Sequence, residues 1–128
     1  MDVPVTFADV AKSEYILLTT FTKDGRPKPT AIWAAPQGDG LVAITQEKSW
    51  KVRRIRNTQR VTIAECDRSG KPKGAAVDAI ATILDKTANG ATYDAIGQRY
   101  GLLGKTFNVF SKLRGGMKTN VTIEIKAA

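Results

Sequence analysis

Short apolar runs joined by tight-turn sequences constrain this chain more than any other feature. The first two runs flank Lys23-Asp-Gly-Arg26, and Asp-Gly suits the positive φ angles of a tight hairpin turn. Gln37-Gly-Asp-Gly40 and Asp67-Arg-Ser-Gly70 predict two further turns. We therefore expect strands at 15–21, 28–34, 41–45, 60–66, 75–84 and 121–125.

The order of these strands favours a mainly β fold. Pro27 and Pro29 cannot donate ladder hydrogen bonds, so the second strand should begin at a sheet edge. The first five strands follow one another with short turns, which predicts an antiparallel meander. With the last strand they predict a small, mostly antiparallel barrel in a single domain spanning 1–128.

Helical patterns are few and short. Residues 6–12 form an amphipathic pattern with Thr6 as a candidate N-cap. Residues 89–100 also have helical spacing, and Gly101 and Gly104 interrupt it. A further turn or two of helix is predicted near residues 107–113.

The composition removes several classes of function. The chain has 128 residues, one cysteine and no histidine, which excludes Ser-His-Asp and Cys-His catalysis and the commonest metal ligand. We expect that any difficult chemistry belongs to a bound cofactor. The net charge of +8 predicts an anionic partner. No apolar run reaches the length of a membrane span, so we expect a cytoplasmic protein.

The segment from Thr45 to Arg60 concentrates this charge. It follows an apolar strand, and Ser49 is a candidate N-cap for a helix. Free N–H groups at a helix N-terminus bind phosphate readily, and nearby cations add to this. The alternative is a solvated basic surface whose apolar side packs on the sheet. The cations are Lys48, Lys51, Arg53, Arg54, Arg56 and Arg60, of which Lys48, Lys51 and Arg54 should share one stripe of the helix.

Two other residues have both a structural and a chemical interpretation. Cys66 ends an apolar strand, where a small buried side chain is more common than a reactive thiol. Asp78 lies in an alternating strand, and we expect it to face outward rather than act as a buried acid.

Taken in order, these pieces resemble the flavin/deazaflavin oxidoreductases. The resemblance rests on an Asp-Gly hairpin, a strand reading Pro29-Thr-Ala-Ile-Trp33, and Thr45-x-x-x-Ser-x-Lys51 before a basic helix. It extends over nearly the whole chain and is strongest to the small B-type members. That resemblance implies the split β-barrel of pyridoxamine 5′-phosphate oxidase.

The resemblance also implies roles for individual residues. Thr45, Ser49, Trp50 and Lys51 match the segment that holds the cofactor's phosphate. The charge pattern of the basic segment adds Lys48 and Arg54 to the candidate cofactor-binding residues. Pro29, Thr30, Ala31 and Ile32 match the strand that runs along the edge of the cofactor ring. Trp33 is either a wall of this site or a core aromatic. Relatives form homodimers with the site between subunits, so Lys112 and Arg114 could reach the partner's cofactor.

The cofactor implied is F420, with FMN as the alternative. F420 carries a phosphodiester and a polyglutamate tail, and the many cations suit such a multi-anionic ligand better than one phosphate. The implied reaction is hydride transfer from reduced F420 to an unsaturated small molecule, with a proton from Tyr, Lys, Arg or solvent.

Other functions stay open at this point. One is a non-catalytic protein that binds F420 or FMN, and another is an FMN-dependent oxidase of the pyridoxamine phosphate type. A nucleic-acid binder rests on charge alone and would bind in a strongly salt-dependent way. We expect a homodimer that acts on a small molecule, with neither nucleic acid nor a membrane as partner.

Overall fold

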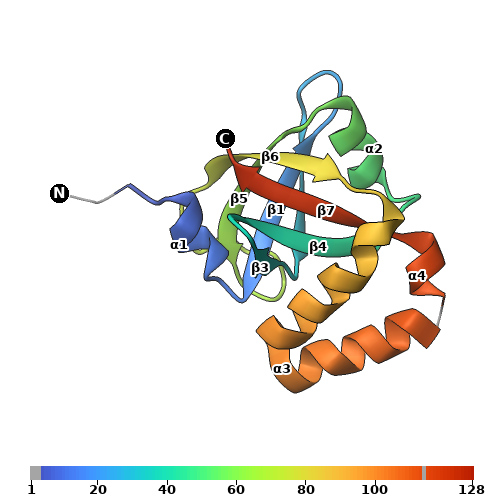
Figure 1. The fold of residues 1–128 in the computed structure, drawn as a ribbon. Coiled ribbons are helices and arrows are strands. Elements are labelled where there is room, and N and C mark those ends of the chain that lie inside the picture. Colours follow the sequence, from blue (N-terminus) through green and yellow to red (C-terminus); the bar gives the residue numbers. More distant parts are fainter. Residues whose placement is uncertain (1–3, 114) are drawn as a thin grey trace.

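The computed structural model describes residues 4–113 and 115–128, and within them it has a mainly β architecture. One curled antiparallel sheet of seven strands forms a half-barrel with helices around it (Figure 1). The strands are β1 Tyr15–Phe21, β2 Pro27–Ile32, β3 Ala35–Gln37, β4 Gly40–Gln46, β5 Arg60–Cys66, β6 Val77–Ile83 and β7 Asn120–Ala127. The helices are α1 Phe7–Ala11, α2 Trp50–Asn57, the short 3-10 helix η1 Lys86–Ala88, α3 Asn89–Leu113 and α4 Gly116–Thr119.

The strand order corrects the predicted meander. Along the sheet the order is β2-β1-β5-β6-β7-β4-β3, so β2 and β4 lie in opposite halves of the sheet. The strands β1–β2, β3–β4 and β5–β6 pair as hairpins, and β6 pairs with β7, the next strand, across a connection that contains η1, α3 and α4. The meander was wrong because β1 pairs with β5 and β4 pairs with β7, and such distant pairs leave no local signal in the sequence. The predicted edge position of β2, with Pro27 and Pro29, is confirmed.

Strand β3 was not predicted. It is three residues long and contains Pro36, and two of its three side chains are exposed, so it has neither length nor alternation to mark it. It pairs with the start of β4 across the predicted turn at Gly38. Gly40 is required here, because a Cβ at this position would lie 2.5 Å from the backbone oxygen of Ile125 in β7.

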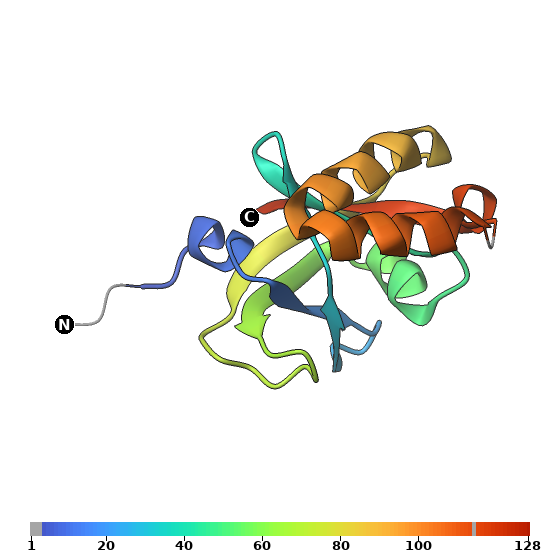
Figure 2. The same ribbon diagram turned by 90° about the horizontal axis from the view of Figure 1, so that it is seen from below.

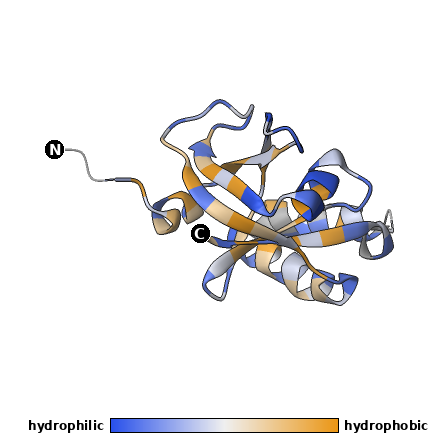
Figure 3. Ribbon diagram, turned by 90° about the horizontal axis from the view of Figure 1, so that it is seen from above, coloured by the Kyte–Doolittle hydropathy of each residue, from blue (hydrophilic) through white to orange (hydrophobic). Residues whose placement is uncertain are grey.

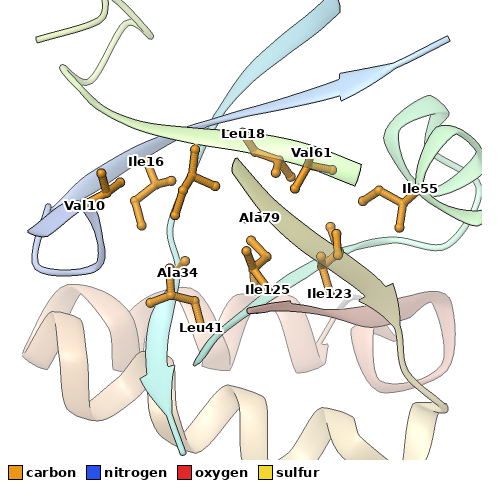
Figure 4. Packing of buried hydrophobic residues seen from close by; sticks show 13 residues of the cluster. Val10, Ile16, Leu18, Ala34, Leu41, Ile55, Val61, Ala79, Ile123 and Ile125 are labelled. Carbon is orange, nitrogen blue, oxygen red and sulfur yellow. The ribbon is translucent and has the colours of Figure 1, made fainter. Parts of the chain in front are cut away.

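The core fills the inside of the curled sheet. Hydrophobic and hydrophilic residues alternate along the strands, as the change between orange and blue shows (Figure 3). Val10 of α1 and Ile55 of α2 lie at opposite ends of the buried cluster (Figure 4). The ends of the half-barrel are thus covered by the two helices whose apolar faces the sequence indicates. The predicted cap of α1 is also confirmed, since Thr6 and Asp9 form a capping box.

Helix α3 is a helical hairpin. Gly101 has φ 60° and ψ −132°, which breaks the helix into two arms. The second arm folds back along the first (Figure 2), and Asn108 Nδ2 donates to the Tyr93 carbonyl at 2.6 Å. The sequence indicated both arms and the break between them. Among the described residues, no helix has the length and apolar character needed to cross a membrane.

Candidate functional site

Helix α2 carries the basic segment to the open side of the half-barrel. Val52 and Ile55 are fully buried, and they anchor one face of the helix on β1 and β6. Ser49 occupies the N-cap position as predicted. The helix ends at Asn57, and β5 begins at Arg60. Of the cationic residues beside this apolar face, Arg53 and Arg56 are exposed, whereas Lys51 and Arg54 are half-buried.

A pocket of about 350 Å³ lies beside α2. Its walls come from β2 and β4, which are far apart in the sheet order, so the pocket marks the place where the curled sheet stays open. This volume is in the range that small ligands occupy. The lining residues are Thr30, Ala31, Ile32, Trp33, Ile44, Thr45, Lys51 and Ile96.

Lys51 is the charged residue of this pocket. Its side chain is half-buried, and it forms no ion pair within the described part of the chain. Burial, followed by the nearby Arg54 charge, holds the pKa of the Lys51 ammonium below its ordinary value. A half-buried cation without a counter-ion costs free energy, and an anionic ligand would offset that cost.

Arg54 lies one turn beyond Lys51 on the same side of α2. Its Nε donates to the hydroxyl of Thr20 in β1 at 2.6 Å, and Thr20 is almost completely buried. Arg54 makes no ion pair in residues 4–113 and 115–128. Two half-buried cations at i and i+3 without an acidic neighbour form a candidate anion site.

Ser49 adds an unsatisfied hydroxyl. Its Oγ is buried and has no hydrogen-bond partner among the described residues, and it does not cap the first turn of α2. Buried polar atoms in proteins are nearly always paired. The hydroxyl, the helix N-terminus and Lys51 together fit an anionic group such as a phosphate.

One family profile matches nearly the whole chain. The sequence profile of pyridoxamine 5′-phosphate oxidase matches residues 6–127. The chain belongs to this family. A comparison with curated protein sequences gives no significant match.

Solved structures agree with this family in fold. A conserved hypothetical protein of Mycobacterium tuberculosis, Rv2991, is 23% identical with a TM-score of 0.70, covering 98% of this chain and 82% of its own. A protein named F420 reductase is 20% identical with a TM-score of 0.62, and the coverage is 98% and 96%. HutZ, a heme storage protein from Vibrio cholerae, is 13% identical with a TM-score of 0.67, covering 93% and 84%. These similarities confirm the split-barrel fold of the family.

Not every predicted residue reaches the pocket. Lys48 was expected on the stripe of Lys51 and Arg54, and this was wrong because α2 begins only at Trp50. Lys48 instead lines a separate cavity with Gln46, Glu47, Lys118 and Thr119. Trp50 is 67% exposed, and the Arg53 guanidinium lies 5.0 Å from its ring centroid.

Of the remaining predicted residues, some line the pocket and others lie outside it. Thr30, Ala31, Ile32 and Thr45 line the pocket as the family resemblance implied, whereas Pro29 is exposed on the edge strand. Lys112 lies on the second arm of α3, with its Nζ 5.3 Å from the centroid of the Tyr93 ring. Arg114 lies outside the described residues.

Two pocket residues, Ile44 and Ile96, carry no recognisable signal in the sequence. Ile44 and Ile96 look like ordinary core positions of a strand and a helix, and only the fold brings them together. Trp33 lines the pocket and stacks on Tyr100 of α3. Of the two interpretations of Trp33, its position agrees with a pocket wall.

The other two residues with a possible chemical role, Cys66 and Asp78, do not line the pocket. Cys66 is buried, and burial raises the pKa of its thiol, as expected for a structural cysteine. Asp78 faces solvent and pairs with Arg60 at 3.4 Å. The described residues contain no cluster of potential metal ligands.

Proposed function

We propose that this chain is an F420-dependent oxidoreductase that transfers hydride from reduced F420 to an unsaturated small molecule. One observation carries the proposal. Lys51 and Arg54 are half-buried without counter-ions in the described chain, beside a pocket with mostly apolar walls. A ligand with an anionic end and a flat apolar body fits such a site.

Different residues of the chain would contact the phosphate and the ring of the cofactor. Ser49, Lys51 and Arg54 would hold the phosphate of the cofactor, and the strand segment Thr30–Ile32 would contact the ring edge. When bound, reduced F420 supplies the hydride. The protein orients the acceptor and excludes water from the pocket.

The basic surface favours F420 over FMN. Beyond Lys51 and Arg54, α2 carries the exposed Arg53 and Arg56, and FMN has only one phosphate for all these charges. The structural similarity to a protein named F420 reductase, which covers nearly both chains, supports the same choice. FMN remains the alternative, because one structural neighbour is named a FAD-binding protein and the family is named for an oxidase.

A binding protein without turnover is a second candidate function. It is supported by the structural neighbour named a heme storage protein, since this fold also serves to hold a ligand. Such a protein would use the same pocket and the same cations, so binding alone does not separate it from a reductase.

Titration of the purified protein with F420 and FMN is the decisive first experiment. Trp33 lines the pocket, so ligand binding should quench its fluorescence, whereas Trp50 is mostly exposed and contributes background. The W50F variant therefore isolates the pocket signal. Micromolar binding of F420 with weaker binding of FMN would support the proposal. Binding of neither cofactor would overturn it.

Turnover separates the two candidate functions. Reduced F420 is mixed with the protein and a panel of quinones, enones and tetrapyrroles, and its reoxidation is followed optically. Acceptor-dependent reoxidation supports the reductase. Tight binding without reoxidation by any acceptor supports the binding protein.

We also propose a homodimer in which a second copy completes the pocket. The pocket is open at the edge of the half-barrel. Lys112 on the second arm of α3 is exposed, so in a dimer it could contact the cofactor bound to the partner subunit. Sedimentation equilibrium gives the mass of the assembly. A monomer that binds F420 with micromolar affinity would contradict this arrangement.

A further inference from the structure

We infer that Thr20 is a positioning residue for anion binding, which it performs by fixing the guanidinium of Arg54. This inference rests on the proposed function, because it concerns the anionic end of the same ligand. Thr20 lies in β1, distant in sequence from the basic segment, and no sequence motif marks it.

The contact between the two residues is specific. Arg54 Nε donates to Thr20 Oγ1 at 2.6 Å, and the Thr20 hydroxyl hydrogen is directed toward the Lys28 carbonyl at 3.4 Å. The hydroxyl thus acts as acceptor for arginine. Thr20 is 1% exposed, so water does not compete for this bond.

The contact leaves the binding end of arginine available. A guanidinium is planar, so fixing Nε also fixes the plane of the two terminal nitrogen groups. No carboxylate in the described chain pairs with them. They remain as donors for a phosphate or carboxylate, in an orientation set before the ligand arrives. Such preorganisation increases affinity because less side-chain freedom is lost on binding.

The neighbouring cation makes this positioning necessary. Lys51 lies one turn before Arg54, and the two positive charges repel each other. A free arginine side chain would swing away from Lys51 into solvent. The bond to Thr20 keeps both cations on the same side of α2, where one anion can contact both.

A double-mutant cycle tests the inference. F420 affinity, or FMN affinity if that is the ligand that binds, is measured by fluorescence titration for wild type, T20V, R54A and T20V/R54A. Valine has the shape of threonine without the hydroxyl. We expect T20V to weaken binding about 5- to 10-fold and R54A about 10- to 100-fold. The double variant should match R54A within about twofold, because Thr20 acts only through Arg54.

Two variants control for structure. T20S keeps the hydroxyl and should bind within about twofold of wild type. Thr19 is the neighbouring residue on the opposite face of β1, so T19V makes the same chemical change away from Arg54 and should also bind like wild type. Thermal unfolding is measured for each variant, and the binding affinities of the double-mutant cycle are compared only among variants that unfold cooperatively.

The outcomes separate the two proposals. If wild type binds neither cofactor, the proposed function fails, and this inference fails with it. If wild type binds and T20V binds equally well, only the inference fails. A T20V effect that persists at full size in the R54A background also overturns it, since the effect would then not pass through Arg54.

Discussion

The rings of Trp33 and Tyr100 stack with their centroids 4.4 Å apart and their planes 11° from parallel. Trp33 directly follows β2, and Tyr100 ends the first arm of α3, so the stack joins the pocket wall to the helical hairpin. The Tyr100 hydroxyl accepts from the Ala34 N–H at 3.1 Å and lies 2.8 Å from the Glu14 carbonyl oxygen, to which it donates. Tyr100 therefore joins α3 to two other backbone segments, one at Ala34 beside the pocket wall and one at Glu14 before β1.

The first prediction concerns this hydroxyl. Y100F keeps the ring stack but leaves the Ala34 N–H without its acceptor, and we expect a loss of about 1–2 kcal/mol in the free energy of unfolding. Urea denaturation measures it. Y15F is a matched control, because the half-buried Tyr15 hydroxyl has no hydrogen bond among the described residues. Equal stability of Y100F and Y15F would show that the hydroxyl does not secure the pocket wall.

The second prediction concerns the backbone contact at Gly40. A Cβ there would lie 2.5 Å from the Ile125 carbonyl oxygen, and backbone cannot move aside as a flexible side chain can. We expect G40A to lower the free energy of unfolding by about 2–4 kcal/mol, in the range of other core strain.

Gly74 provides the comparison for this substitution. A Cβ at Gly74 meets nothing within 4 Å, and its φ is not in the left-handed region. G74A should leave the unfolding midpoint in urea within the error of wild type, or raise it slightly through the unfolded state. Similar midpoints for G40A and G74A would contradict the close approach of β4 to β7.

The local elements of this fold are predictable from the sequence, and their partners are not. Strands β1 and β5 have the predicted bounds, because alternation and Gly-containing turns are local signals. The pairing of β1 with β5 depends instead on which apolar faces meet in three dimensions. The strand patterns alone predicted a small antiparallel barrel with a meander, and the resemblance to a family predicted that this barrel is of the split type.

The site was predictable to a similar extent. Lys51 and Arg54 are three residues apart, and this spacing places them on one side of α2 as expected. Lys48 was misplaced because it precedes the N-cap Ser49, so helical spacing does not set its direction. Thr20 contacts Arg54 and Tyr100 contacts Ala34 from distant segments of the chain, each through its side-chain hydroxyl. Such contacts have no sequence pattern.

The third prediction concerns the buried polar network that attaches α3 to β7. Thr122 Oγ1 lies 2.8 Å from Thr92 Oγ1 and donates to Asn89 Oδ1 at 3.0 Å, and all three residues are fully buried. T122V leaves the Asn89 oxygen without this donor, so we expect a loss of about 1–3 kcal/mol. T82V is a control, since Thr82 in β6 is only half-buried.

A double variant tests the network more sharply. T92V removes the partner of Thr122, so T92V/T122V should cost less than the sum of the two single variants. Unfolding free energies from urea denaturation give this comparison. Strict additivity would show that the two hydroxyl groups act independently, despite the distance of 2.8 Å between them.

The fourth prediction is the pH dependence of anion binding through Lys51. An anion binds the protonated ammonium, and burial together with Arg54 lowers the pKa of Lys51 from its ordinary value. Affinity for F420 should therefore fall as the pH rises through this lowered pKa, below the ordinary lysine value of about 10.4. Fluorescence titrations over a series of pH values measure the effect.

Two variants assign this pH dependence to Lys51. Arginine stays charged throughout this range, so K51R should bind with an affinity that no longer falls over the same pH interval. R54A removes the repelling charge, which should raise the pKa of Lys51 and move the loss of affinity to higher pH. The two variants change the profile in different ways because one replaces the titrating group and the other changes its surroundings. A profile that is the same in wild type and K51R would mean that another group titrates, and that Lys51 does not contact the anion.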